Sequence, residues 1–329
     1  MMAKGFDNMP IGKEPKLTTC AEILMERDRQ KKNLRSYIFV EGRSDVCAVQ
    51  NWRNKVSCTV EYCGDKDKVI ALMRRASVIK LNESTGLDGI VGIVDRDFDH
   101  FCSDTPALPS RTLYLPDLND LESIVMRYAG DDILAGLVLG DPLSPWFAVD
   151  GKFNTIERLV RYVVAPIGAL RVAWQQEASP QNKYPPKLDP FVNGIEGSIV
   201  DCIVWDKVDS NTPLSAESLW AMQTRILNQG AKNAILDRIV QICDKQLKDQ
   251  PWSLVRGKDL VNALASLVQS LPSANRRYEN STVGDLCRVI KSKIETLYSP
   301  GMGQSQSLDQ ALGEIAKTDR STYQYLLIP

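Results

Sequence analysis

Acidic residues follow two apolar runs in the first third of the chain, and their chemistry suits a divalent metal ion. Glu41 ends the run YIFV in SYIFVEGRSDV, and Asp45 comes four residues later. Asp95 and Asp97 follow the run GIVGIV in GIVGIVDRDFDH. Magnesium prefers oxygen ligands, and two such ions can stabilise the attacking and leaving oxygens of a phosphoryl displacement. The pattern favours metal-dependent phosphoryl chemistry, provided that the fold brings the two runs together.

A third group of acids stands in LPDLNDLES, which contains Asp117, Asp120 and Glu122. Carboxylates about 4 Å apart repel each other by roughly 4 kcal/mol per pair at an effective dielectric constant near 20. A cation should therefore sit among them if they converge. Glu122 is the candidate metal ligand of this group.

The elements that must position these acids alternate between strands and helices. We predict strands at 37–40, 56–62, 90–94 and 111–115, with helices over 45–55, after Gly64 and Asp65, and from LNDLESIVM onward. This alternation predicts an α/β fold with a mostly parallel sheet flanked by helices. The carboxyl ends of parallel strands meet at one edge, where ligands bind. Gly42 would let the backbone turn between Glu41 and Asp45.

The remainder of the chain reads differently, which divides the sequence into three regions. We expect residues 1–33 to form an N-terminal tail and helix, residues 34–130 the α/β domain, and residues 131–329 a mainly helical domain. Amphipathic patterns predict helices within the last region at 155–175, 215–228, 231–248, 258–271 and 282–298. The proline-rich stretch 179–191 is expected to be a loop or linker.

Composition limits the classes of function. No apolar run approaches the roughly 20 residues that span a bilayer, and the N-terminus has no apolar secretory segment, so we expect a cytoplasmic protein. The eight cysteines form no CxxC pair and are expected to be free thiols. A single histidine, His100, excludes a multi-histidine metal site. The net charge of −1 does not by itself indicate a nucleic-acid partner.

Several of these residues also have ordinary structural interpretations. Asp45, Asp65 and Asp120, taken singly, are more typical of helix caps than of chemistry. Arg43 and Arg96 could bind substrate phosphates, neutralise the acids or lie in solvent. His100 is expected to be a loop residue. Local positive groups in the helical region more often form solvated helix faces than phosphate contacts; they are Arg158, Arg161 and Arg171, then Arg276 and Arg277, then Arg288, Lys291 and Lys293.

The motif VEGRSD followed by GIVDRDFD resembles the TOPRIM domain of topoisomerases, primases and OLD-family nucleases. With LPDLNDLES and the later WSLVRGKDL, the chain is most similar to the TOPRIM effectors of PARIS-type anti-phage systems. The resemblance extends from about Leu34 to Leu260.

The resemblance implies roles for particular residues. Glu41, Asp95, Asp97 and Lys258 would be catalytic, and Asp45 and Glu122 would join the three acids as metal ligands. Asp45 stands where OLD nucleases have a glutamate. The implied cofactor is Mg²⁺ or Mn²⁺, two ions in all. Lys258 would stabilise charge in the transition state; the other interpretation is an exposed lysine at a helix start.

The implied function is a magnesium-dependent TOPRIM endonuclease that cleaves nucleic acid, with RNA, including tRNA, favoured over DNA. It would be a toxic effector of abortive infection, held inactive by an ABC-type ATPase of the same defence system, and a homodimer is one arrangement for its active form. Two alternatives stay open. The chain could be a catalytically inactive TOPRIM-like binding subunit, or the metals could serve nucleotidyl transfer instead of hydrolysis.

Overall fold

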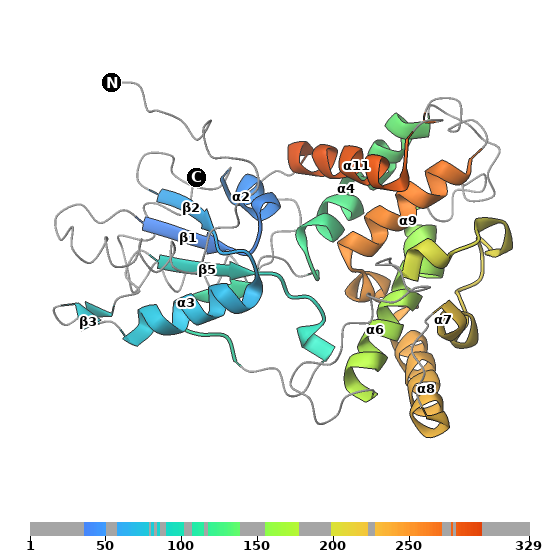
Figure 1. Ribbon diagram of the computed structural model, residues 1–329, viewed down its shortest axis with the longest axis horizontal. Helices are drawn as coiled ribbons and strands as arrows, with labels where there is room; N and C mark the ends of the chain where they lie inside the picture. The colour runs from blue at the N-terminus through green and yellow to red at the C-terminus, as the bar shows by residue number, and fades with distance from the viewer. Residues whose placement is uncertain are drawn as a thin grey trace. The chain divides into compact units, whose positions relative to one another are not determined.

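The structure is a computed structural model whose described residues fall into two compact units. They are residues 36–50, 58–78, 80–81, 84–85, 90–101, 107–114, 118–138, 155–177, 199–222, 228–271, 278 and 281–297. The predicted N-terminal helix, Asp117 and the proline-rich stretch lie outside them. We call residues up to Asp95 together with 107–114 the sheet unit, and residues 96–101 together with 118–297 the helical unit. Each unit is described by itself (Figure 1).

The sheet unit is built on four parallel strands in the order β2-β1-β5-β6. The strands are β1 (Ser36–Val40), β2 (Cys58–Tyr62), β5 (Ile90–Val94) and β6 (Thr112–Tyr114). Every residue of β5 is buried, which explains why its sequence is continuously apolar. The predicted α/β fold with a parallel sheet is confirmed, and its arrangement is consistent with a TOPRIM-like domain. A short antiparallel pair, β3 (Lys80–Leu81) and β4 (Ser84–Thr85), lies between β2 and β5 in the sequence.

Two helices connect the first strands, α2 (Arg43–Gln50) and α3 (Lys66–Val78). The connection from β1 to β2 crosses the sheet in one direction, and the connection from β2 to β5 returns past β1 in the other. Because parallel crossovers are right-handed, connections of opposite direction place their helices on opposite faces. The helices α2 and α3 therefore cover different faces of the sheet.

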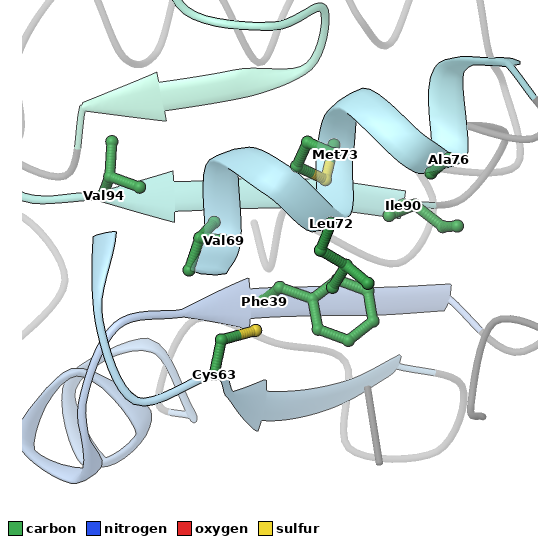
Figure 2. Packing of buried hydrophobic residues seen from close by; sticks show 8 residues of the cluster. All are labelled: Phe39, Cys63, Val69, Leu72, Met73, Ala76, Ile90 and Val94. Carbon is green, nitrogen blue, oxygen red and sulfur yellow. The ribbon is translucent and has the colours of Figure 1, made fainter. Parts of the chain in front are cut away.

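The core under α3 joins the helix to the central strands (Figure 2). Val69 and Met73 of α3 face the sheet, where Phe39 and Val94 belong to the same buried cluster. The helix can approach β5 closely because Gly92 has no side chain. A Cβ atom at Gly92 would lie 2.7 Å from Cγ of Met73, a distance that atoms in real structures do not adopt.

The helical unit contains short 3₁₀ segments and longer helices. In chain order they are η1 (Asp99–Phe101), α4 (Leu121–Val138), α5 (Thr155–Leu159), the π-helical turn η2 (Val160–Val164), α6 (Ala165–Glu177), η3 (Ile199–Cys202), η4 (Trp205–Lys207), α7 (Ala216–Met222), α8 (Gln229–Gln246), η5 (Pro251–Leu254), α9 (Gly257–Ser270) and α11 (Val283–Leu297). The predicted helical C-terminal region is confirmed. Helix α4 runs through residue 130, where the sequence suggested a boundary.

A buried ion pair lies inside this unit between α6 and α9. The guanidinium of Arg171 donates to both carboxylate oxygens of Asp259, at 2.7 and 2.8 Å. Both side chains are almost fully enclosed. The expectation that Arg171 belongs to a solvated positive face is therefore wrong, because α9 supplies a buried partner 88 residues away in the sequence.

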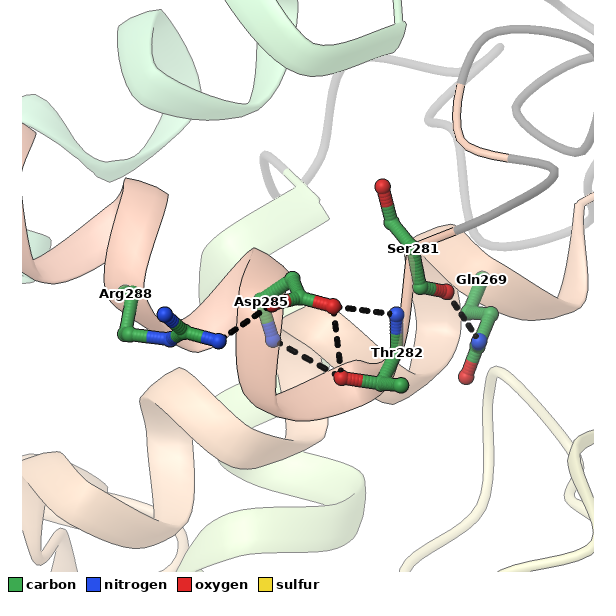
Figure 3. A network of polar contacts seen from close by, with 5 residues as sticks. All are labelled: Gln269, Ser281, Thr282, Asp285 and Arg288. Carbon is green, nitrogen blue, oxygen red and sulfur yellow. Dashed lines mark hydrogen bonds and ion pairs between the residues drawn. The ribbon is translucent and has the colours of Figure 1, made fainter.

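The start of α11 shows how polar residues fix a helix end (Figure 3). The Asp285 carboxylate accepts hydrogen bonds from the Thr282 backbone N–H and hydroxyl, both at 2.8 Å, and pairs with Arg288. These bonds to Thr282 lower the pKa of Asp285, ahead of the smaller effect of Arg288. Gln269 at the end of α9 donates to the Ser281 carbonyl at 2.9 Å. The network joins the end of α9 to the start of α11.

None of the helices that the structure describes combines the length and the apolar character that a bilayer crossing requires.

Candidate active site

Two of the predicted site residues, Glu41 and Asp95, meet at the carboxyl edge of the sheet. Glu41 follows β1 directly and Asp95 follows β5 directly. The Glu41 carboxylate accepts a hydrogen bond from the backbone N–H of Asp95, with 2.7 Å between Oε1 and N. Both residues are partly buried. The prediction that these two segments, 54 residues apart, converge is confirmed for this pair.

The strand order makes this position special. From β1 the chain continues to β2 on one side, and from β5 it continues to β6 on the other side. Neighbouring strands whose connections leave in opposite directions form a topological switch point, and the loops that part there leave a crevice at the carboxyl edge. Ligands of open α/β sheets bind at such points. Glu41 and Asp95 stand at the ends of the two strands that form it.

Asp45 lies close to this edge, where it caps α2. Its Oδ2 accepts a hydrogen bond from the Gly42 backbone N–H at 2.8 Å, three residues before it. This bond is the reciprocal half of a capping box, and the negative charge also suits the first helical turn. Asp45 is buried, with 6% of its surface exposed. The capping interpretation thus has direct support, and the role of Asp45 as a metal ligand stays a prediction.

Asp97 belongs to the helical unit and has an unusual backbone. Its φ angle is +48°, in the left-handed region that few residues other than glycine adopt. Aspartate tolerates this region better than most side chains. The conformation is held by a hydrogen bond from the Asp97 N–H to the Asn119 carbonyl, at 2.9 Å. The Asp97 side chain is exposed to solvent. A strained residue of this kind, next to Arg96 and Asp95, is typical of functional loops.

Asn119 connects this loop to the distant segment WSLVRGKDL. Its side-chain amide donates to the Ser253 carbonyl at 2.8 Å and to the Val255 carbonyl at 2.7 Å. The side chain is completely buried. The two segments that carry the later part of the sequence resemblance, LPDLNDLES and WSLVRGKDL, are therefore in direct contact although 136 residues separate Asn119 from Val255.

Asp120 completes this contact by capping two helices at once. Its Oδ1 accepts from the Ser123 N–H in the first turn of α4, at 2.9 Å, and its Oδ2 from the Gly257 N–H in the first turn of α9, at 2.6 Å. Burial raises the pKa of Asp120 to about 7, and the nearby Glu122 carboxylate adds to this effect. The capping interpretation is supported for Asp120, as it is for Asp65, which accepts from the Lys68 N–H at 2.8 Å.

The same contact sets the neighbourhood of Lys258 and Glu122. A Cβ atom on Gly257 would lie 2.4 Å from Cβ of Glu122 and 2.4 Å from Oδ1 of Asp120, so only glycine allows α9 to start here. Lys258 follows Gly257 and is exposed, and Glu122 is half-buried. The structure thus brings the start of the Lys258 helix against the Glu122 backbone segment. Their catalytic and metal-binding roles stay predictions.

The basic residues near the acids differ in their surroundings. Arg43 is exposed and donates to the Tyr62 hydroxyl at 3.2 and 3.3 Å. Arg96 lies in the turn closed by a hydrogen bond from the Asp99 N–H to its carbonyl, at 3.1 Å. Burial and the charge of Arg96 lower the pKa of His100 to about 4, so its imidazole is neutral at pH 7. Substrate binding by Arg43 and Arg96 stays a prediction.

The donor set of this edge fits magnesium. Glu41 and Asp95 offer hard carboxylate oxygens, and magnesium is typically held by one or two carboxylates together with waters and substrate phosphates. The carboxylates of Glu41 and Asp95 are the candidates for that role. Across the part of the chain that is described, no group of three or more His, Cys, Asp or Glu side chains is arranged to hold a metal ion. The additional ligands Asp45, Asp97 and Glu122 are therefore predictions.

Sequence reasoning missed Asn119 and Gly257, which hold the segments LPDLNDLES and WSLVRGKDL together within the helical unit. Asn119 and Gly257 gave no signal of their own, because an asparagine in a loop and a glycine before a helix are common. The contacts of Arg43 with the Tyr62 ring and of Lys66 with the Tyr114 ring were also missed. Comparison with known proteins adds no further assignment, since no protein-family model and no curated protein matches this chain.

Proposed function

We propose that the chain is a magnesium-dependent endonuclease of the TOPRIM type. The observation that carries this proposal is the meeting of Glu41 and Asp95 at the topological switch point of a parallel sheet, linked by the 2.7 Å hydrogen bond. Two carboxylates at such a point suit a magnesium ion that keeps waters and substrate phosphates in its shell. Asp97 is a third acid near in the sequence, since only Arg96 separates it from Asp95, and the Cα atoms of the two aspartates can be at most about 7 Å apart.

We propose the following roles for individual residues of the chain. Glu41, Asp95 and Asp97 would hold the metal, with Asp45 and Glu122 as further ligands for a second ion. When bound, magnesium or manganese would polarise the phosphate and activate water. Arg43 and Arg96 would orient the substrate phosphates through paired N–H donors. Lys258 would stabilise negative charge that develops at the scissile phosphate.

The substrate that we propose is RNA, including tRNA, in preference to DNA. The support is the sequence resemblance to TOPRIM effectors of anti-phage systems. The same resemblance supports a cytoplasmic toxic effector of abortive infection that an ABC-type ATPase holds inactive until infection, with a homodimer as the active form.

The test is cleavage of tRNA and of plasmid DNA by the purified full chain in magnesium, compared with Glu41→Ala and Glu41→Gln. The glutamine can still accept the hydrogen bond from the Asp95 N–H but carries no charge. We expect both variants to lose at least about 100-fold in rate, the usual scale for a catalytic electrostatic contact.

Glu61→Gln is the matched control, since Glu61 is a half-buried glutamate inside β2 of the same sheet, in register with Phe39 of β1 and not with Glu41. It should cleave like the wild type. Equal degradation by wild type and both Glu41 variants would refute the nuclease and leave the chain as a binding subunit.

A further inference from the structure

Two pairs of a basic and an aromatic residue stand at the carboxyl edge of the sheet unit, on its two outer strands. Tyr62 ends β2, and the Arg43 guanidinium lies 5.4 Å from its ring centre as well as donating to its hydroxyl. Tyr114 ends β6, and the Lys66 ammonium lies 5.6 Å from its ring centre. All four residues belong to the sheet unit. The edge that carries the predicted acids thus also carries two pairs of a basic and an aromatic residue, which the acid motifs did not reveal.

The strand order places these pairs on either side of the acids. From β2 to β6 the sheet contains β1 and β5, which are followed directly by Glu41 and Asp95. Neighbouring strands are about 4.8 Å apart, so the two outer strands are roughly 14 Å apart. A chain of nucleotides laid along this edge from Tyr62 to Tyr114 would pass both acids.

The two tyrosines face opposite sides of the sheet. Tyr114 packs against the buried cluster under α3, and its register partner is Val94 of that cluster. Tyr62 is in register with Val40 and contacts Arg43 of α2, the helix on the other face. A nucleic acid strand that contacts both tyrosines must therefore cross the carboxyl edge of the sheet between them. The crossing point is the Glu41 and Asp95 switch point.

Aromatic rings beside cations are the usual means of holding unpaired nucleotides. Bases stack on the ring, the cation meets the phosphate, and the ring must reach a base that is not already stacked in a duplex. A rigid double helix has no unstacked base to offer to either tyrosine. The carboxyl edge of the sheet is therefore suited to single-stranded nucleic acid.

We propose that Tyr62 with Arg43 and Tyr114 with Lys66 form a binding surface for single-stranded nucleic acid across the carboxyl edge of the sheet. The surface selects an unpaired segment, such as a loop, and leads it over Glu41 and Asp95. This inference rests on the proposed nuclease function for its purpose, but binding can be measured without cleavage.

The test uses the full chain carrying Glu41→Gln, without metal, and follows fluorescence anisotropy of a labelled unstructured oligoribonucleotide and of the same sequence in a duplex. We expect tighter binding of the single strand. Tyr62→Leu and Tyr114→Leu keep apolar volume and remove the ring, so each should weaken single-strand binding by about 5- to 100-fold and leave duplex binding unchanged. Arg43→Ala should weaken both and lower the salt dependence by about one phosphate contact.

Tyr37→Leu is the matched control. Tyr37 is a partly buried tyrosine packed against the same cluster, but it lies near the amino end of β1, about three residues before the carboxyl edge. This variant should bind like its parent, and its unfolding measures how much a lost tyrosine ring costs in stability. A Tyr62 or Tyr114 variant that unfolds in the assay is replaced by the corresponding phenylalanine and histidine variants, which keep a stacking ring and should keep binding.

The outcomes separate the two proposals. If single strands bind through the two tyrosines but the wild type cleaves nothing in magnesium, the surface stands and the nuclease does not. If the wild type cleaves but Tyr62→Leu and Tyr114→Leu bind single strands like Tyr37→Leu, or if duplex binds as tightly as single strand, the surface is refuted and the nuclease stands.

Discussion

The carboxyl edge of the sheet unit and the junction between α4 and α9 in the helical unit both centre on carboxylates, but they use them differently. At the junction, Asp120 is enclosed, and both its oxygens accept N–H groups from helix starts. At the edge, Glu41 and Asp95 are only partly buried. A hydrated ion can approach the second kind of carboxylate and not the first. Burial therefore separates acids that fasten helices from acids that could do chemistry.

We expect the largest effect from breaking the buried ion pair of the helical unit, between Arg171 and Asp259. Arg171→Leu would leave the Asp259 carboxylate, which is 1% exposed, without its cation. Removing one partner of a buried ion pair typically costs about 3–5 kcal/mol of unfolding free energy. Urea denaturation followed by circular dichroism measures it. Arg288→Leu, which removes an exposed arginine from the network of Figure 3, is the control and should unfold like the wild type. A similar midpoint for both variants would contradict a structural role for Arg171.

The next effect concerns the junction itself. Asp120→Ala would leave two buried N–H groups, those of Ser123 and Gly257, without an acceptor, at a cost of about 2–4 kcal/mol. Asp120→Asn keeps one acceptor oxygen and should lose less. The same denaturation experiment measures both. An unchanged stability of Asp120→Ala would mean that this carboxylate does not fasten the two helices.

A third prediction distinguishes a conformational role of Asp97 from a role in metal binding. Asparagine and glycine both accept the left-handed backbone at φ +48°, and neither supplies a carboxylate. If Asp97 holds metal, both variants should fold normally and lose at least about 100-fold in cleavage rate. Thermal unfolding and a tRNA cleavage assay measure the two properties. A glycine variant that cleaves at the wild-type rate would assign Asp97 a conformational role alone.

We expect the smallest effect at Asp45, which caps a helix as Asp120 does but lies near the carboxyl edge of the sheet. Asp45→Ala removes the cap of α2 and should cost about 1 kcal/mol. Asp45→Asn keeps an oxygen for the Gly42 N–H, so its stability should stay near that of the wild type. If Asp45 also binds metal, the asparagine variant should cleave at least about 10-fold more slowly. Cleavage at the full rate would identify Asp45 as a cap and nothing more.

The sheet and its edge could be predicted because the signals are local. Continuous apolar runs predicted buried parallel strands, whereas the strand order that makes β1 and β5 neighbours was not predicted. Once the strands are parallel, the residues that follow them share one edge, so the presence of Glu41 and Asp95 at the same edge was predicted. The Asp65 cap was predicted for the same reason, since its partner is three residues away.

The helical unit could not be predicted in this detail because its key contacts join distant segments. No pattern near Asn119 indicates that its amide binds carbonyls more than 130 residues away. Nothing in the sequence around Arg171 distinguishes it from an exposed helical arginine, because its buried partner Asp259 lies on the distant helix α9. The turn η2 was missed because one widened turn barely disturbs the apolar spacing of the predicted helix at 155–175. The left-handed backbone of Asp97 likewise depends on the Asn119 carbonyl.

The central claim is that the acids at the carboxyl edge of the sheet bind a divalent cation. Calorimetric titration of the full chain with manganese and with magnesium measures this directly, comparing wild type, Glu41→Gln and Glu61→Gln. We predict binding by the wild type and by Glu61→Gln, and at least a tenfold loss of affinity in Glu41→Gln. The same binding heat and affinity in all three proteins would contradict it.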